Sequence, residues 1–293
     1  MTNPTVSDLP LVRTRSVGGV QIHALEAGLQ RLDGGAMFGV VPRPLWEKRI
    51  QPDERHRIPL ALRCLLVEAP SALVLVDTGI GNKESDKFKA IYGVENEGRP
   101  TRLEEAIREA GFEPGDVDLV VSTHLHFDHA GGNTIRRPDG GVEPAFPAAR
   151  YTVQRGEWDF AHRRNERIQA SYLPDNFDPV QEAGLWDFVE GEVLLTEGIR
   201  LLPTPGHTPY HQSVLIESEG ETACYLADVC PTTAHVPLPW IMGYDLDPLA
   251  TLESKRGLWD RALHEEWLLI FEHDPEVPWG YLSEDLKGLE APG

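Results

Sequence analysis

The chain contains little cysteine: Cys64, Cys224 and Cys230 are its three cysteines in 293 residues. An odd number cannot pair completely within one chain, and two of the three lie in apolar, strand-like runs. This pattern argues against a small secreted domain held together by disulfides. We therefore expect reduced, buried thiols in a cytoplasmic protein.

Long hydrophobic runs are absent as well. No apolar run approaches the ~20 residues that a membrane span needs, so we expect no membrane partner. The residues from Met1 to Asp8 have neither a basic start nor a continuous apolar segment. We therefore expect no signal peptide.

Positive charge is scarce: 27 Lys and Arg stand against 47 Asp and Glu, and the formal net charge is −20. A nucleic-acid backbone requires a basic surface, so we expect no nucleic-acid partner. No linker, charge block, low-complexity tract or repeat divides the chain. We therefore expect one domain over 1–293 that acts on a small-molecule substrate.

The strongest signal is a cluster of ligand-type side chains that follows the apolar run 117–121. This run predicts a buried strand, and His124, His126, Asp128 and His129 come directly after it. At strand spacing the first two point to one face, and the other two can turn towards the same volume. Imidazole and carboxylate groups bind zinc and similar divalent metals. The cluster therefore predicts half of a two-metal site.

The other half is found downstream. His207, Asp228 and His273 each come shortly after an apolar, strand-like run. Ligands gathered from several strand ends suit a rigid scaffold that positions catalytic groups.

These motifs resemble the full ligand set of the metallo-β-lactamase-fold hydrolases. The pattern His-x-His-x-Asp-His over 124–129 is followed by the three later ligands in the family's order, and Asp77-Thr-Gly79 is similar to the family's early strand-end motif. The resemblance covers most of the chain, from 77 to 273. It implies an α/β protein with the four-layer αββα sandwich of that family.

The resemblance, together with the expected geometry, also implies a dinuclear site. The ligands of the first metal would be His124, His126 and His207; those of the second would be Asp128, His129 and His273; and Asp228 would bridge both. We expect two divalent ions, with zinc as the first candidate, although the ligand set also suits iron, manganese, cobalt or nickel. A metal-bridging hydroxide would then attack the substrate.

Three further residues are candidates for catalytic roles. Asp128 would also carry a proton to the leaving group, and Asp77 resembles the family's carboxylate that orients a metal-bound imidazole. The alternative for Asp77 is a turn-forming side chain. His235 either reaches the pocket or is a surface-loop histidine. His211 either fixes a ligand or satisfies a buried polar contact.

The substrate class stays open between a lactone, an ester and a phosphotriester. The two histidine motifs are similar to those of acyl-homoserine lactonases, but the tyrosine that those enzymes carry shortly after the bridging aspartate is missing from Asp228-Val-Cys-Pro231. The segment after Asp228 looks more like that of the methyl parathion hydrolase branch. The alternatives are a thioester hydrolase similar to glyoxalase II and a non-enzymatic metal-binding protein.

The sequence also predicts several individual elements. We expect paired strands at 60–68 and 72–76, a helix that begins with the capping box at Thr101, and another helix over about 248–266. The irregular, aromatic segments 29–58 and 158–188 are expected to form the pocket wall or a lid. The alternatives for these segments are ordinary packing or the surface of a homodimer.

Overall fold

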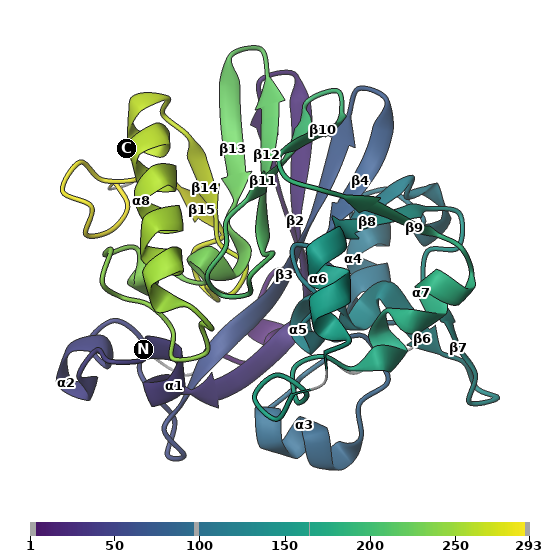
Figure 1. Ribbon diagram of the computed structural model, residues 1–293, viewed down its shortest axis with the longest axis horizontal. Helices are drawn as coiled ribbons and strands as arrows, with labels where there is room; N and C mark the ends of the chain where they lie inside the picture. Colours follow the sequence, from purple (N-terminus) through teal and green to yellow (C-terminus); the bar gives the residue numbers. More distant parts are fainter. Residues whose placement is uncertain (1–3, 97–99, 164, 291–293) are drawn as a thin grey trace.

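Two β-sheets lie face to face, with helices on their outer sides (Figure 1). The computed structural model describes residues 4–96, 100–163 and 165–290. Arg164 of the expected lid segment and both ends of the expected domain lie outside these residues. The arrangement confirms the predicted αββα sandwich.

The first sheet contains most of the amino-terminal strands, and its second half is parallel. In spatial order it consists of β1 (Val12–Val17), β2 (Val20–Asp33), β3 (Arg57–Ala69), β4 (Ala72–Val76), β5 (Leu119–Val121), β8 (Arg150–Gln154) and β9 (Trp186–Val189). A separate small hairpin consists of β6 (Thr134–Arg136) and β7 (Val142–Pro144).

The second sheet is formed by the carboxyl-terminal strands. In spatial order it consists of β10 (Val193–Thr196), β11 (Ile199–Pro203), β12 (Gln212–Ser218), β13 (Glu221–Tyr225), β14 (Leu268–Ile270) and β15 (Trp279–Gly280). The α-helices of the described residues are α1 (Gly34–Phe38), α2 (Arg43–Trp46), α3 (Asp86–Tyr92), α4 (Arg102–Glu109), α5 (Phe127–Ala130), α6 (Arg155–Ala161), α7 (Asp178–Glu182) and α8 (Pro248–His264).

Strand β4 shows why the sheets stack. Successive side chains of a strand point to opposite faces. Val74 and Val76 belong to the hydrophobic core between the two sheets, while Leu73 and Leu75 belong to the core beneath the helices of the first sheet. Both faces of β4 are therefore buried, which explains its continuous apolar sequence.

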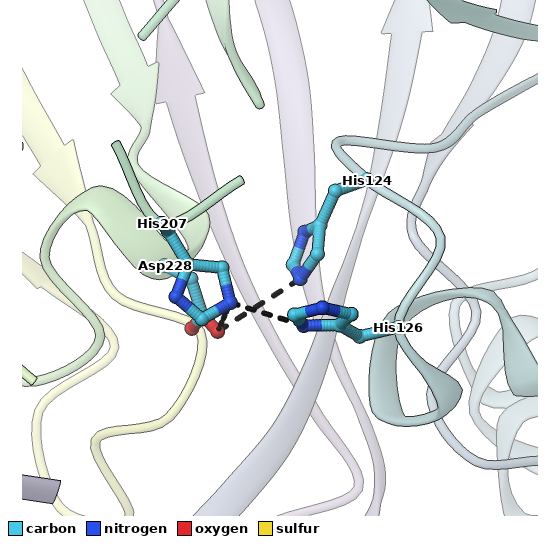
Figure 2. A group of neighbouring side chains, drawn as sticks. All are labelled: His124, His126, His207 and Asp228. Atoms are coloured by element: carbon cyan, nitrogen blue, oxygen red, sulfur yellow. Dashed lines mark hydrogen bonds and ion pairs between the residues drawn. The ribbon is translucent and has the colours of Figure 1, made fainter. Parts of the chain in front are cut away.

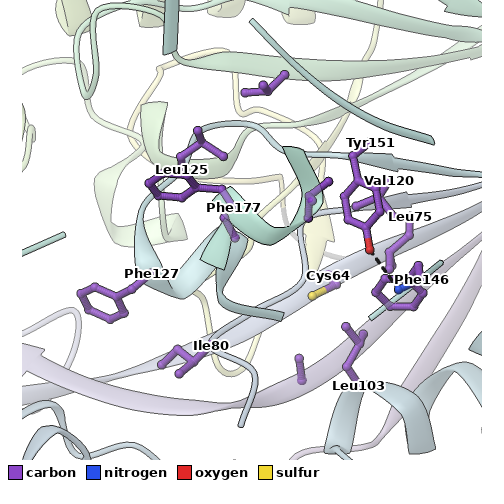
Figure 3. Close-up of a cluster of buried hydrophobic side chains, with 14 of the residues drawn as sticks. Cys64, Leu75, Ile80, Leu103, Val120, Leu125, Phe127, Phe146, Tyr151 and Phe177 are labelled. Carbon is purple, nitrogen blue, oxygen red and sulfur yellow. Dashed lines mark hydrogen bonds between the residues drawn. The ribbon is translucent and has the colours of Figure 1, made fainter. Parts of the chain in front are cut away.

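The outer faces are covered by amphipathic helices. The Thr101 capping box is present, as predicted, and α4 buries Leu103, Ala106 and Ile107 against the first sheet. Figure 3 shows part of this core, in which the Tyr151 hydroxyl accepts a hydrogen bond from the Phe146 amide. On the other side, α8 packs Leu258, Trp259 and Ala262 against the second sheet.

The predicted elements 60–68, 72–76 and 248–266 are present with small differences in their ends. The expectation of an irregular segment over 29–58 is wrong for 29–33. Residues 29–33 continue β2 because they pair with 57–61 of β3 beyond a register shift between Glu26 and Leu29. The expectation is also wrong for 57–58, which belong to β3, and for 186–188 of the other segment, which belong to β9.

The three cysteines are free and buried, as predicted. Among the described residues, no helix combines the length and apolar character that a membrane crossing requires.

The core between the sheets should contribute strongly to stability. Ile216 on β12 is fully buried there, so Ile216→Ala should lower the free energy of unfolding by about 2–5 kcal/mol through lost burial and a residual cavity. Urea denaturation with a chelator present measures this change without a contribution from metal binding. Leu194→Ala, at a position 57% exposed on β10, is the control and should change stability by no more than about 0.5 kcal/mol. Equal losses for both variants would contradict this account of the core.

Candidate metal centre

The structure brings all seven predicted ligands together where strands of both sheets end. They are His124, His126, Asp128 and His129 after β5, His207 after β11, Asp228 after β13 and His273 after β14. Six of the seven side chains are buried, and His126 is partly exposed. The sandwich thus holds the two halves of the motif, far apart in the sequence, around one volume.

Two glycines allow the close packing that this arrangement requires. A Cβ on Gly132 would lie 2.2 Å from the carbonyl oxygen of Thr78, in the turn that also holds Asp77. A Cβ on Gly206 would lie 2.2 Å from the backbone nitrogen of Thr251 in α8. The loop that carries His207 therefore lies directly against α8.

The first group of ligand atoms comes from His124, His126, His207 and Asp228 (Figure 2). His207 Nε2 lies 3.0 Å from both His126 Nδ1 and Asp228 Oδ2. His124 Nε2 lies 3.9 Å from the same carboxylate oxygen. All four ligand atoms lie within 4.8 Å of one another, which is close enough for one ion to contact them all.

The second group consists of Asp128, His129 and His273. The Nε2 atoms of the two imidazoles are 3.3 Å apart, and each lies 3.9 Å from an Asp128 oxygen. Asp228 adjoins this group too: its Oδ1 is 3.2 Å from His273 Nε2, and its Oδ2 is 3.5 Å from His129 Nε2. One carboxylate therefore lies between the two groups.

This donor set fits divalent metal ions. His124 Nε2 is buried and has no hydrogen-bond partner within the described part of the chain. Asp228 Oδ1 makes no hydrogen bond there either, although His273 Nε2 lies 3.2 Å away. An unpaired buried polar atom costs about 1–3 kcal/mol, and a coordinated cation removes that cost. Nitrogen and carboxylate donors without a thiolate are typical of catalytic zinc and related ions.

Electrostatics favours the ligating protonation state for three of these groups. Burial lowers the pKa of both His124 and His126 well below its usual value, so these imidazoles are neutral, as metal binding requires. Burial disfavours the charge of Asp228, but the neighbouring His207, His129 and His273 hold its pKa well below the usual range. Asp228 is therefore an anion at neutral pH.

Four of the five imidazoles are fixed from outside by a contact to Nδ1, which turns Nε2 inward. These contacts are Thr123 Oγ1 at 3.1 Å for His124, Asp77 Oδ2 at 3.1 Å for His129, Asp245 Oδ1 at 2.9 Å for His207 and the Ala61 carbonyl at 2.7 Å for His273. Outer partners of this kind set the tautomer and the ring direction of metal ligands. Asp77 has the contact expected of the orienting carboxylate.

Two carboxylates beside the proposed ligands were not among the residues predicted from the sequence. Asp245 contacts His207, and Glu272 Oε2 lies 2.9 Å from His129 Nδ1. Burial raises the pKa of Glu272 to about 7, although His129 opposes this shift. The position of Glu272 next to His273 was a usable signal; Asp245 had none, because 38 residues separate it from His207.

His235 lies outside the group of ligands. Its Nδ1 contacts Thr232 Oγ1 at 2.7 Å, its Nε2 contacts the Met37 carbonyl at 2.9 Å, and its ring stacks on Phe38. Both ring nitrogens are thus engaged in holding the loop, and His235 does not line the cavity beside the ligands. His211, by contrast, accepts a hydrogen bond from the Asp228 amide at 3.2 Å and helps to fix that ligand.

A cavity of about 360 Å³ opens onto the ligands. Its floor includes Asp128, His207 and His273, and its walls are largely apolar. Most wall residues come from both expected pocket segments and from a third: Leu32, Ala36 and Met37; Arg167, Ile168, Ala170 and Ser171; and Met242, Gly243, Tyr244 and Leu246. Leu60, Tyr92 and Phe127 complete the wall. Segments 29–58 and 158–188 therefore both contribute to the pocket wall.

Known proteins are similar to this chain in sequence and in fold. The family model described as the metallo-beta-lactamase superfamily matches residues 58–264. An N-acyl homoserine lactonase from Bacillus sp is 32% identical over 231 residues, which cover 75% of this chain and 84% of the relative. A solved Staphylococcus aureus protein, described as a probable metal-dependent hydrolase, is 31% identical with a TM-score of 0.88, covering 94% of this chain and 97% of its own.

A solved quorum-quenching N-acyl homoserine lactone lactonase also has this fold. It is 25% identical with a TM-score of 0.66, and the match covers 90% of this chain and 95% of that chain. The family model, the relatives and the site geometry lead to one assignment: the chain belongs to the metallo-beta-lactamase superfamily and is a metal-dependent hydrolase.

Proposed function

We propose that the chain binds two divalent metal ions, zinc in the first place. The first ion is held by His124, His126 and His207, and the second by Asp128, His129 and His273. Asp228 contacts both. The observation that supports this assignment is the placement of the Asp228 carboxylate between two groups of inward-turned nitrogens.

When bound, such ions lower the pKa of water to about 7 and polarise the oxygen of a substrate carbonyl or phosphoryl group. The residues of the chain do the rest. Asp128 lies on the cavity floor, where Gln30 donates a hydrogen bond to its Oδ2. We assign Asp128 the transfer of a proton to the leaving group. Asp77 orients His129, and the apolar walls exclude water around the reacting group.

We propose a lactone with an acyl side chain as the substrate, with simple carboxylic esters as the second candidate. The lactonase relatives support this choice, and so does the apolar cavity, which suits an alkyl chain above a polar reacting group. Asp228-Val-Cys-Pro231 supplies no phenol, but Tyr92 and Tyr244 line the cavity from other segments. Either of these two tyrosines can therefore place a phenol near the substrate. Cytoplasmic location and a homodimer stay predictions.

Metal content tests the assignment of the ligands. Purified protein should hold about two divalent ions per chain, and His273→Ala should hold about one and lose roughly 10–100-fold or more in kcat/KM. Elemental analysis and circular dichroism measure the metal content and the fold. His264→Ala, at an exposed position on α8, is the matched control and should keep both ions. Full activity in His273→Ala would refute the second metal group.

The length of the substrate's acyl chain tests the proposed substrate class. Each CH₂ buried in the apolar cavity contributes about 0.8 kcal/mol, so two added methylenes should raise kcat/KM for acyl lactones roughly tenfold until the cavity is filled. Ile168→Glu, which places a carboxylate in the wall, should remove this dependence; Leu249→Glu, at a position 73% exposed, should not. If the hydrolysis rates of the wild type do not depend on the length of the acyl chain, the substrate belongs to a different class.

A further inference from the structure

Glu157 on α6 is a fully buried carboxylate outside the proposed ligand set. Its Oε1 accepts hydrogen bonds from the Tyr172 hydroxyl at 2.7 Å and from the Leu125 amide at 3.2 Å. Its Oε2 accepts one from the Thr208 hydroxyl at 2.7 Å. All three donors are uncharged. A buried carboxylate with neutral partners is costly, so its presence calls for a role beyond core packing.

The donors identify that role, because two of them are next to metal ligands in the sequence. Leu125 lies between His124 and His126, and Thr208 directly follows His207. These two loops belong to different sheets: one follows β5 and the other follows β11. The carboxylate therefore connects the two loops that supply every imidazole of the first group.

The third donor concerns the orientation of His126. This imidazole turns its Nδ1 inward, towards His207 Nε2, whereas the other four turn Nε2 inward. His126 therefore cannot be fixed by an outer contact to Nδ1, as the other four rings are. Instead, the ring of Tyr172 meets the His126 ring edge on, with centroids 4.7 Å apart, and the Tyr172 hydroxyl is held by Glu157.

We propose that Glu157 is a further positioning residue of the first metal group. It fixes the distance between the two ligand loops through Leu125 and Thr208, and it fixes the His126 ring through Tyr172. Loss of this carboxylate frees both loops and weakens binding of the first ion. The inference rests on the proposed assignment of the first group to a metal.

Metal affinity tests the proposal directly. In Glu157→Ala, competition with a chromophoric chelator should show the first ion bound about tenfold or more weakly. Glu157→Gln should bind it nearly as tightly as the wild type, because the amide oxygen still accepts from Tyr172 and Leu125 and the amide nitrogen can donate to Thr208. Asp159→Asn, an exposed position on the same helix, is the matched control and should leave the affinity unchanged.

Two milder variants decide the question if Glu157→Ala fails to fold in thermal melts. Thr208→Val and Tyr172→Phe each remove one hydrogen bond and keep the shape of the side chain. Both variants should bind the first ion more weakly and should alter the visible spectrum of bound cobalt(II). Where the alanine variant folds, adding Thr208→Val to it should cost no further affinity, since both changes break one contact.

The outcomes separate this proposal from the metal assignment. If the wild type binds no metal, the proposed function itself fails. If the wild type binds metal and the Thr208, Tyr172 and folded Glu157 variants bind it equally tightly, the role of Glu157 alone is overturned.

Discussion

The carboxylate of Asp228 is the contact on which the rest of the site depends. Its two oxygens lie 3.0 Å from His207 Nε2 and 3.2 Å from His273 Nε2, and they also approach His124 and His129. A buried carboxylate is strongly destabilising unless opposite charge and hydrogen bonds surround it. Residues from both sheets supply these partners, so the site exists only when the two sheets are packed in one arrangement.

Contacts between the sheets set that arrangement next to the ligands. The Tyr225 hydroxyl on β13 donates to the Arg63 carbonyl on β3, and the Arg63 guanidinium donates to the carbonyl oxygens of Phe271 and Asp274, which flank His273. Asp77 and Ala227, in the turns after β4 and β13, both have positive φ angles, of 55° and 48°. Such backbone is costly for residues other than glycine and persists where surrounding packing enforces it. The packing between the sheets thus keeps the backbone of Asp77 and Ala227 in these unfavourable conformations at the site.

The gathering of the seven proposed ligands was predictable because its chemistry is local: imidazoles and carboxylates that follow apolar runs are visible in a single sequence. The αββα fold followed from the family resemblance, and the helix at Thr101 from its capping box. The contacts around the ligands were mostly not predictable. Asp245 and Glu157 reach His207 and its loop from distant segments, and nothing in their sequence neighbours marks them. His235 shows the converse, since a histidine near Asp228 was a catalytic candidate but is engaged through both ring nitrogens.

The cavity separates the chemistry of the floor from the recognition of substrate by the wall. The wall is formed by connecting segments that hold one another: Gly243 N donates to the Ala36 carbonyl, the Arg167 guanidinium donates to the Gly243 carbonyl, and Met37 and Met242 belong to one hydrophobic cluster. The floor is instead fixed by strands and by buried carboxylates. Substitutions in the wall can therefore change the shape of the cavity without moving the ligands. Under the proposed function, this separation assigns the choice of substrate to the wall residues around Met37, Ile168 and Met242.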